Sequence, residues 1–286
     1  MCRFHVAVRA PSHLGDGVMA LPALQAIRAV SARMTIYAPR WGPALYRELD
    51  ALVLPTGAMG PADAAVLMAP SLRAAWEARA VPRRIGTAAD RRGPLLTEVV
   101  EEGVHQADTY ARLAAAVGGR AEGPPRYRSE VVDTDIPAGH VGLNPISVSG
   151  AVREWPGYSA LADRLARPVV FYGGPGDQEA VARIAGNHEA RVGLSLPDFA
   201  AALSRCALFV SNDSGAAHFA AACGVPVLVV YGSTTASRTG PAGAVGVEGP
   251  PLPCRPCYKQ RCALGRPACL DIPVGDVLSA VERALG

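Results

Sequence analysis

The sequence lacks a strong excess of charge of either sign. Its 28 Lys and Arg residues and 25 Asp and Glu residues leave a formal net charge of only +3 at pH 7. A protein that binds a nucleic acid backbone carries a much larger basic excess, so we expect no nucleic-acid partner. The sequence also has no short-period repeat and no low-complexity tract, which disfavours a solenoid and a disordered chain.

A long uninterrupted hydrophobic run is missing as well. The opening residues, MCRFHVAVRA, have neither the apolar segment nor the small-residue cleavage site of a signal peptide, and they are more typical of a first strand. The most apolar stretch, residues 216–231, contains His218 and a Gly-Val-Pro break. It is therefore a poor membrane span, and we expect no transmembrane segment.

Basic residues do crowd one short segment, which contains Arg83, Arg84, Arg91 and Arg92. This segment is either a solvated face or a landing site for an anionic acceptor or a membrane surface. We expect a cytoplasmic protein, for which a peripheral contact with the inner face of the cytoplasmic membrane stays open.

The seven cysteines are not accompanied by an export signal, which favours thiols or metal ligands over a disulfide framework. Cys254, Cys257, Cys262 and Cys269 follow a C-x2-C-x4-C-x6-C pattern, with Arg, Lys, Pro and Gly between them. Four thiolates in so short a segment can hold Zn²⁺ or iron as a structural metal. Reduced thiols or one disulfide are the alternatives.

Strand-like apolar runs alternate with Ala- and Leu-rich helical runs, which is typical of βαβ units and a parallel sheet. The first series ends with a helix over 107–117, followed by a segment rich in Pro, Gly and charge. A second series begins at HVGLNP and includes PVVFYGG, ALFVS and VPVLVVYG. We predict two α/β domains, 1–138 and 139–286, the second with a Cys-rich tail (254–269) and a C-terminal helix.

A short segment of small polar residues, SNDSG, separates two apolar runs in the second domain. The run before it, ALFVS at 207–211, is typical of a buried strand, and the run after it, 215–223, is typical of a helix that ends at Gly224. Asp213 or Ser214 is well suited to cap this helix. The first backbone N–H groups of the helix have no intrahelical partner and lie at the positive end of its dipole, so an anion can bind there.

A second candidate phosphate-binding segment follows the next strand. GSTTASRTGP, residues 232–241, is rich in glycine and small hydroxyl residues, including Ser233 and Thr234. The alternative for both segments is purely structural. Asp213 is then only an N-cap, His218 only a core histidine, and the hydroxyl-rich segment an ordinary loop.

The order and spacing of these motifs resemble one known family. LGDGVMALPAL, PSLRAAW, VPRRIG, NPISVSGAVREWP, FYGGPGD, VSNDSGAAHFAAACGVPV and GSTTASRTGP are together similar to the ADP-heptose:lipopolysaccharide heptosyltransferases of glycosyltransferase family 9, most closely the heptosyltransferase II branch. The resemblance implies a GT-B architecture: two Rossmann-like α/β/α domains whose parallel sheets face a central cleft, with the donor bound mainly by the second and the acceptor by the first.

The resemblance also implies a reaction. A heptose is transferred from ADP-heptose with inversion, and neither a metal nor another cofactor is required for the chemistry. The acceptor is a lipopolysaccharide inner core, another glycan, a small natural product or a protein. A nucleotide-sugar epimerase and a non-catalytic sugar-nucleotide-binding relative are the alternatives. A nicotinamide-dependent oxidoreductase is disfavoured, because S-H-L-G-D-G stands where a G-x-G-x-x-G would follow the first strand.

The family's site residues are carried over position by position. Asp16 in LGDG matches the general base, and Arg153 in VREW matches a lysine that contacts the donor diphosphate. Asp213 matches an aspartate that holds the donor. His218 matches the histidine downstream of it, and Asp177 falls near a family carboxylate that contacts the nucleoside. Local chemistry adds Ser214 and Gly215 at the helix start, and Ser233 and Thr234 in the hydroxyl-rich segment, as donor-binding candidates. The acceptor-binding candidates are Ser71 and Arg73 in PSLRAAW and Arg84 in VPRRIG.

Local chemistry leaves alternatives for two of these residues. Asp16 can instead cap the helix beside it, and Arg153 can be a surface arginine next to Trp155. The chain also departs from the family, because Pro145-Ile146-Ser147 stands where Pro-Gly-Ala is usual and the first domain is short. The first departure removes a glycine from a loop close to the phosphates, and the second lies in the domain where the acceptor is chosen.

Overall fold

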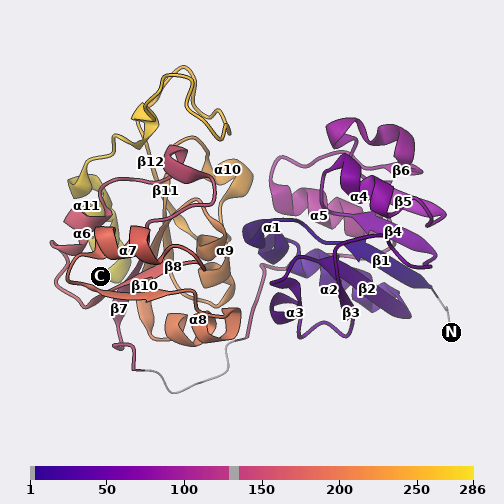
Figure 1. The fold of residues 1–286 in the computed structure, drawn as a ribbon, viewed down its shortest axis with the longest axis horizontal. Helices are drawn as coiled ribbons and strands as arrows, with labels where there is room; N and C mark the ends of the chain where they lie inside the picture. The colour runs from indigo at the N-terminus through magenta and orange to yellow at the C-terminus, as the bar shows by residue number, and fades with distance from the viewer. Residues whose placement is uncertain (1–3, 129–134) are drawn as a thin grey trace. The chain divides into compact units, whose positions relative to one another are not determined.

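The structure is a computed structural model that describes residues 4–128 and 135–286. The chain divides into two compact units, Met1–Pro125 and Arg126–Gly286, each built on one six-stranded sheet (Figure 1). The border falls ahead of position 138, where the sequence pattern places the change of domain. Tyr127 already belongs to the second unit, because its N–H donates to the Ala222 carbonyl at 2.8 Å and its ring packs against Phe219. Residues 129–134 of the predicted boundary segment lie outside the described residues.

The first unit has a parallel sheet with the strand order β3-β2-β1-β4-β5-β6. Its strands are β1 (His5–Arg9), β2 (Arg33–Ala38), β3 (Leu52–Pro55), β4 (Ala64–Leu67), β5 (Arg83–Gly86) and β6 (Glu98–Val99). Its helices are α1 (Leu14–Met19), α2 (Leu21–Val30), α3 (Gly42–Leu45), α4 (Leu72–Glu77) and α5 (Gln106–Ala115). Two 3₁₀ turns, Ala89–Arg91 and Gly93–Leu95, separate β5 from β6.

Helices cover both faces of this sheet. Ala75 of α4 and Ala78 just beyond it form one buried cluster with Tyr37 of β2 and Leu67 of β4. Helices α1 and α2 pack beside α5, and α2 and α5 contact the sheet at β2 and β4. Because the central strands are buried on both faces, they consist of continuous apolar runs, which is why the sequence predicts them well.

The second unit repeats this design with the parallel order β12-β11-β10-β7-β8-β9. Its strands are β7 (His140–Asn144), β8 (Val169–Gly173), β9 (Glu189–Val192), β10 (Cys206–Asn212), β11 (Val227–Tyr231) and β12 (Val245–Glu248). Its helices are α6 (Tyr158–Ala162), α7 (Gln178–Ala185), α8 (Leu196–Leu203), α9 (Gly215–Ala222), α10 (Ala236–Thr239) and α11 (Val274–Leu285), with 3₁₀ turns at Gly150–Val152 and Ala268–Leu270.

The two faces of the second sheet are packed differently. Residues of α6, α7 and α11 join the alternate residues of β7, β8, β10 and β11 in one mainly aliphatic cluster, which also contains Trp155, Tyr158 and Phe171. On the other face, rings from α8 and α9 meet rings of the sheet, and Phe199 stacks on Phe219 with 5.7 Å between ring centroids. This unit is therefore a three-layer α/β/α sandwich, as the resemblance implies.

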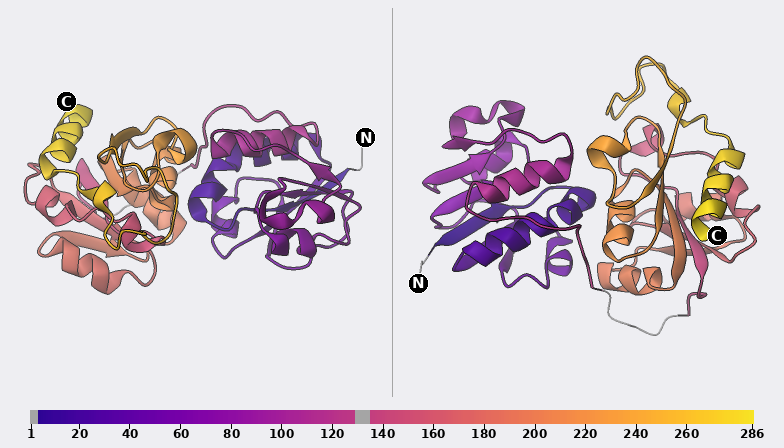
Figure 2. Two further views of the ribbon diagram at one scale, coloured as in Figure 1. Left: turned by 90° about the horizontal axis from the view of Figure 1, so that it is seen from above. Right: turned by 180° about the vertical axis from the view of Figure 1, so that it is seen from behind.

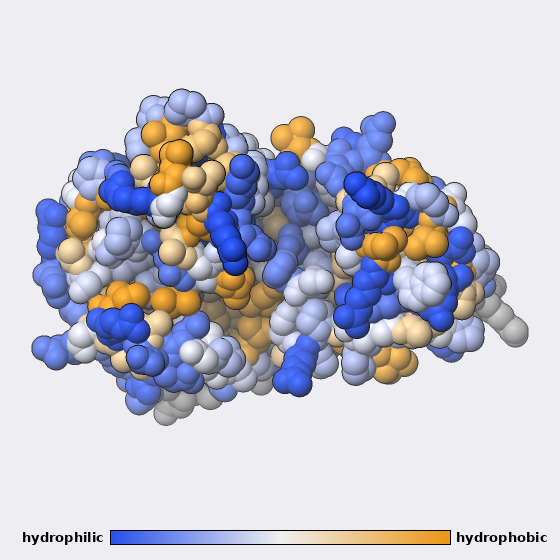
Figure 3. Space-filling model, turned by 45° about the horizontal axis from the view of Figure 1, so that its top comes forward, coloured by the Kyte–Doolittle hydropathy of each residue, from blue (hydrophilic) through white to orange (hydrophobic). Residues whose placement is uncertain are grey.

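The segment from Cys254 to Cys269, which we call the cysteine tail, contains no helix or strand before the turn at Ala268. It runs as an extended loop between β12 and α11, drawn in orange-yellow to yellow in Figure 1 and in the two views of Figure 2. No helix within 4–128 or 135–286 is both long and apolar enough to cross a membrane. Apolar residues occur in small groups among hydrophilic ones on the face drawn in Figure 3.

Each sheet has one point where the strand order reverses. In the first sheet it lies between β1 and β4, and in the second between β7 and β10. The chains that leave two such neighbouring strands turn to opposite faces of the sheet, which opens a crevice at their carboxyl ends. Ligands of open α/β sheets bind there, so these two edges are where the predicted site residues must be located.

Candidate active site

At the reversal point of the second sheet, Asn212 joins the ends of two strands. Its amide nitrogen donates to the Pro145 carbonyl at 2.7 Å, directly after β7. Its side-chain oxygen accepts from the Trp155 N–H at 3.0 Å and from the Tyr158 hydroxyl at 3.1 Å. The loop between Pro145 and Trp155 is thereby fastened to the end of β10. Arg153, which lies on this loop, is placed beside the residue that follows β10.

That residue is Asp213, which is buried and lies in the middle of the SNDSG segment. Its Oδ2 atom lies 3.7 Å from Nη1 of Arg153 and accepts a hydrogen bond from the Thr239 hydroxyl at 3.1 Å. The structure thus brings together three segments that lie apart in the sequence: the VREW loop, the SNDSG segment and the hydroxyl-rich segment. Arg153 is not an isolated surface arginine.

Helix α9 begins without a side-chain cap. Its N-cap residue is Ser214, whose hydroxyl contacts the Ser211 hydroxyl at 2.9 Å and makes no capping hydrogen bond. Asp213 is engaged with Arg153 and Thr239 instead. Ser214 therefore holds the N-cap position as expected, but neither Ser214 nor Asp213 caps the helix through its side chain. The first N–H groups of α9, from Gly215 on, have neither an intrahelical acceptor nor a side-chain cap, and they present the positive end of the helix dipole.

Polar atoms without a partner gather at this edge of the sheet. Among the described residues, six buried side-chain atoms have no hydrogen-bond partner, and five of them belong to the second unit: Asn144 Oδ1, Arg153 Nε, the Tyr231 hydroxyl, Ser233 Oγ and Thr234 Oγ1. All five come from the ends of β7 and β11 or the loops that follow them. Leaving such a group unsatisfied costs about 1–3 kcal/mol, and native proteins rarely do so. These atoms are available to pair with a polar ligand.

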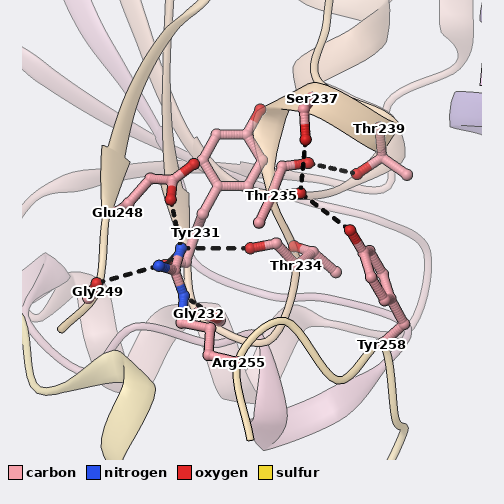
Figure 4. Close-up of polar contacts among 10 residues, drawn as sticks. All are labelled: Tyr231, Gly232, Thr234, Thr235, Ser237, Thr239, Glu248, Gly249, Arg255 and Tyr258. Carbon is pink, nitrogen blue, oxygen red and sulfur yellow. Dashed lines mark hydrogen bonds and ion pairs between the residues drawn. The ribbon is translucent and has the colours of Figure 1, made fainter. Parts of the chain in front are cut away.

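The hydroxyl-rich segment, which we call the hydroxyl loop (Gly232–Pro241), is held by the cysteine tail. Arg255 donates to the Gly232 carbonyl at 2.7 Å and to the Gly249 carbonyl at 3.2 Å, and it pairs with Glu248 at 2.9 Å (Figure 4). The backbone N–H groups of Cys257 and Tyr258 donate to the Ser233 carbonyl at 3.1 and 3.0 Å. The Tyr258 and Thr235 hydroxyls lie 2.9 Å apart. The tail therefore fixes the backbone from which Ser233 and Thr234 project.

The cysteine tail also contains a pocket of about 90 Å³. It is lined by all four cysteines of the predicted metal site, Cys254, Cys257, Cys262 and Cys269, together with Lys259, Arg261, Arg266 and apolar side chains. The four cysteines are free thiols, so the disulfide alternative is not realised here. Burial raises the pKa of the Cys269 thiol, and the neighbouring Cys257 and Cys262 raise it further.

The four thiols do not form a ligand set as they stand. Across the part of the chain that the structure describes, no three His, Cys, Asp or Glu side chains are grouped closely enough to hold a metal ion. The sequence pattern predicted such a group at this tail. The structure places the four sulfur donors around one pocket but does not draw them together.

The other two predicted donor-side residues have separate positions. Asp177 stands at the N-cap position of α7 but makes no capping bond, and its Oδ2 accepts from the Gly174 N–H at 2.8 Å, which closes the turn after β8. His218 is buried one turn into α9. Both lie on elements that follow strands of the second sheet, at the same carboxyl edge as Asp213.

In the first unit, Asp16 lies in the first turn of α1, which follows β1 at the reversal point of that sheet. The N-cap of α1 is His13, so the alternative that Asp16 caps the helix is wrong. The Tyr110 hydroxyl of α5 is hydrogen-bonded to Asp16. Burial and the charge of Asp16 raise the pKa values of Tyr46 and Tyr110 well above the ordinary phenol value.

The predicted acceptor-side residues all make local contacts. Ser71 is the N-cap of α4 and accepts from the Ala74 N–H at 3.2 Å. Arg73 donates to Glu77 at 2.9 Å. Arg84 donates to the Leu95 and Val81 carbonyls at 2.7 and 2.6 Å. None of these contacts is with Asp16 or with another residue at the end of β1.

The basic segment around these residues is not a uniformly solvated face. Arg92 is fully buried and donates to the Thr87 carbonyl at 2.7 Å and to the Ala69 carbonyl at the end of β4. Burial lowers the pKa of Arg92 to about 10. Arg83 pairs with Glu98 at 2.8 Å. The guanidinium groups of these two arginines are therefore already paired within the first unit and stabilise its fold.

Comparison with known proteins decides the family. Residues 59–267, well over half of the chain, match the model of glycosyltransferase family 9 (heptosyltransferase). The chain belongs to glycosyltransferase family 9. The resemblance found in the sequence motifs is thereby confirmed, and with it the prediction that the protein is a glycosyltransferase. Asp16 precedes the matched residues, so its role rests on the local motif and its surroundings.

Individual relatives agree with this membership. A stretch of 70 residues is 40% identical to lipopolysaccharide heptosyltransferase 1 of Pseudomonas aeruginosa, and it spans 24% of this chain and 20% of that protein. The solved structure of E. coli ADP-heptose lipopolysaccharide heptosyltransferase II aligns with 99% of this chain. The alignment includes 98% of the E. coli chain, with a TM-score of 0.78 and 20% identity.

A third relative contains a metal. TibC, an iron-containing dodecameric glycosyltransferase of enterotoxigenic E. coli, covers 99% of this chain and 77% of its own, with a TM-score of 0.68 and 15% identity. It has also been solved in complex with ADP-D-β-D-heptose. At these identities the structural likenesses establish the fold, and the predicted GT-B fold with two parallel α/β sheets is confirmed.

Several residues of the site were not predicted from the sequence. Asn144 and Asn212 end buried strands, and a polar residue at that position is a recognisable signal. Tyr46, Tyr110 and Arg255 carry no such signal, because each lies far along the chain from the segment that it supports.

Proposed function

We propose that this protein is an inverting glycosyltransferase that transfers a heptose from ADP-heptose to an acceptor hydroxyl. The observation that carries the proposal is the group of unpartnered buried polar atoms around Asp213 and the uncapped start of α9. Family membership and the ADP-heptose complex of TibC support the choice of donor.

The donor diphosphate binds at the start of α9 in this proposal. Arg153 and the backbone N–H groups at Ser214 and Gly215 supply positive potential and hydrogen-bond donors, which replace a divalent cation. Ser233 and Thr234 contribute hydroxyls that have no partner in the described residues. A carboxylate repels phosphate, so Asp213 does not contact the diphosphate in this proposal. It holds Arg153 and accepts hydrogen bonds from hydroxyl groups of the donor sugar.

His218 and Asp177 complete the donor site. His218 lies on α9, one turn after the proposed diphosphate position, and Asp177 lies after β8 and is assigned to the nucleoside by the family resemblance. Because one oxygen of Asp177 closes the turn at Gly174, the other oxygen is the one assigned to the nucleoside.

Asp16 is the proposed general base. Its carboxylate takes the proton of the acceptor hydroxyl as the acceptor oxygen attacks the anomeric carbon. The bond between that carbon and the diphosphate oxygen breaks, the configuration inverts, and ADP leaves with the electron pair. Such a base accelerates the reaction by about 100- to 10,000-fold. Arg153 and α9 stabilise the charge that develops on the leaving group.

The acceptor is a lipopolysaccharide inner core or another glycan or natural product. Ser71, Arg73 and Arg84 are the proposed acceptor contacts, through the atoms that their local bonds leave over. A lipid-linked acceptor brings the protein to the inner face of the cytoplasmic membrane, as a peripheral contact.

A structural metal is a separate proposal. Four sulfur donors around one pocket are the chemistry that Zn²⁺ and iron prefer, and the family likeness includes an iron-containing protein. Since the thiols are not drawn together, the tail has to close around such an ion. Metal analysis of the purified protein tests this, and the transfer reaction needs no step at the metal.

The function is tested by incubating the protein with ADP-heptose, with and without a deacylated inner-core acceptor, and analysing both sugar products. Transfer of heptose to the acceptor with release of ADP is expected. Isomerised ADP-heptose formed without acceptor identifies an epimerase. Donor binding without either product identifies a non-catalytic relative.

A further inference from the structure

Two buried phenols lie beside Asp16 in the first unit. Tyr110 comes from α5 and Tyr46 from the end of α3, and both side chains are almost completely excluded from solvent. Helices α2, α3 and α5 all pack against α1, which carries Asp16. The charge of Asp16 acts on both phenols, and each phenol keeps its proton because burial and this charge raise its pKa far above neutrality. At working pH both groups are therefore hydrogen-bond donors.

Tyr110 has the hydrogen bond that fixes its orientation. Gln106 lies one helical turn before Tyr110 on α5, so both side chains lie on the same face of the helix. The Tyr110 hydroxyl is hydrogen-bonded to the side chains of both Gln106 and Asp16. Since an ionised carboxylate can only accept, the single phenol proton goes to Asp16, and the Gln106 amide donates to the phenol oxygen. In this series of two hydrogen bonds, Gln106 donates to Tyr110 and Tyr110 donates to Asp16.

Tyr46 supplies a second, independent observation. Its hydroxyl is buried and has no hydrogen-bond partner among the described residues. A Cβ atom added at Gly17, the neighbour of Asp16, would lie 3.1 Å from this hydroxyl and 2.4 Å from the Trp41 ring. Glycine at position 17 thus allows α1 to approach the Tyr46 hydroxyl closely. A buried phenol is rarely left unpaired, so its place beside a carboxylate requires an explanation.

We propose that Tyr110 is a positioning residue that holds the Asp16 carboxylate for proton abstraction, and that Tyr46 is a reserve donor to the same carboxylate. This inference rests on the proposed role of Asp16 as general base. Tyr110 contacts neither substrate in this proposal and acts through Asp16. The Tyr46 hydroxyl pairs with Asp16 when the carboxylate turns toward the acceptor.

The titratable groups around Asp16 determine the expected pH response. Tyr46 follows α3 and Tyr110 lies on α5, while Arg28 of α2 is paired with Asp50 at the far end of its helix. A hydrogen bond to a carboxylate favours its charged form. Without the Tyr110 donor, protonation of the base becomes easier. The acidic limb of the rate profile then moves to higher pH.

The test compares Tyr110→Phe, Tyr46→Phe and Gln106→Leu with the unaltered full-length protein, using ADP-heptose and a deacylated inner-core acceptor. Tyr172→Phe is the matched control, because Tyr172 is a buried phenol that bonds His140 Nε2 at 2.8 Å in the second unit. For each variant kcat is measured from pH 5 to 9, and the dissociation constant of ADP is measured by calorimetry. For Tyr110→Phe we expect kcat at pH 7 to fall roughly tenfold and the acidic limb to move up by about one pH unit.

The other variants are expected to follow in a fixed order. Gln106→Leu moves the acidic limb in the same direction by less, and Tyr46→Phe has the smallest effect, because its hydroxyl is unpaired at rest. ADP binding stays unchanged in all three, and Tyr172→Phe leaves the limb in place. If Tyr110→Phe does not fold, Gln106→Leu alone decides the matter by the same shift.

An acidic limb that stays in place in both Tyr110→Phe and Gln106→Leu overturns the inference. Failure of the inference and failure of the proposed function are separable. If Asp16→Asn retains transfer, the proposed base is wrong; if Asp16→Asn abolishes transfer while the phenol variants match the control, only the positioning role is wrong.

Discussion

The two units share one sheet topology, but they differ in how they treat the polar groups at the point where the strand order reverses. In the first unit the carboxylate of Asp16 is bonded by Tyr110 and enclosed by helices. In the second unit Arg153, Ser233 and Thr234 keep buried polar atoms without partners. In the proposed function, a base has to be held before its substrate arrives, whereas a diphosphate site must keep its donors available. The two reversal points differ in the sense that this proposal requires: Asp16 already has a hydrogen-bond donor, while the described residues of the second unit leave five buried polar atoms without partners. The Tyr46 hydroxyl beside Asp16 is the unpaired atom among the described residues of the first unit.

The largest effect expected is loss of the base. Asp16→Asn keeps the size of the side chain but cannot accept the acceptor proton, so kcat should fall by about 100-fold or more. ADP-heptose binding, measured by calorimetry, should stay within twofold, because the proposed donor site lies in the other unit. Equal losses of transfer and of donor binding would show that Asp16 supports the structure instead.

A smaller effect is expected at the donor edge. Arg153→Ala removes the cation beside Asp213 and one of the unpaired donors. We expect donor affinity to fall by about 10- to 100-fold, the value of a charge-assisted hydrogen bond. Arg153→Lys should recover part of the affinity, since the ammonium retains the charge but not the planar fork.

Arg183→Ala is the control for this measurement. Arg183 lies on α7 and is exposed, with Glu179 3.8 Å away. If its replacement weakens donor binding as much as that of Arg153, the effect reflects the charge of the unit as a whole and not the site.

The sequence predicts the core of this fold better than its edges. Strands such as β10 and β11 are buried on both faces and form continuous apolar runs, so they are recognisable without neighbours. The edge strands β9 and β12 are short, half-exposed and mixed in polarity, and they were not predicted. Ala20 separates α1 from α2, and Pro22 lies near the start of the second helix.

The same contrast holds for the candidate site. Arg153 and Asp213 lie in motifs that reveal them, since each follows a buried strand and has an unusual local composition. Tyr110 and Arg255 cannot be found this way, because their partners are set by tertiary packing. The metal pattern in the cysteine tail shows the opposite limit: the spacing suggests four ligands, but the loop leaves its thiols apart.

The support of the donor edge by the cysteine tail predicts a moderate effect. Arg255→Lys replaces a fork that reaches the Gly232 and Gly249 carbonyls and Glu248 with a single ammonium. The hydroxyl loop should loosen, so that KM for ADP-heptose rises about three- to tenfold while kcat changes little. Arg266→Lys, which alters an exposed pair with Asp271 at 2.6 Å in the same tail, should leave KM unchanged.

The smallest effect is expected at Ser71, where the first unit uses a predicted acceptor contact as a helix cap. Ser71→Ala should lower the free energy of unfolding by about 1 kcal/mol, because the Ala74 N–H loses its acceptor. Ser71→Asp should recover the stability, because an aspartate also caps a helix. It lacks the hydroxyl donor of serine. If the hydroxyl also contacts the acceptor, KM for the acceptor rises in both variants. An unchanged KM in Ser71→Asp assigns Ser71 to the fold alone and shifts acceptor recognition toward Arg73 and Arg84.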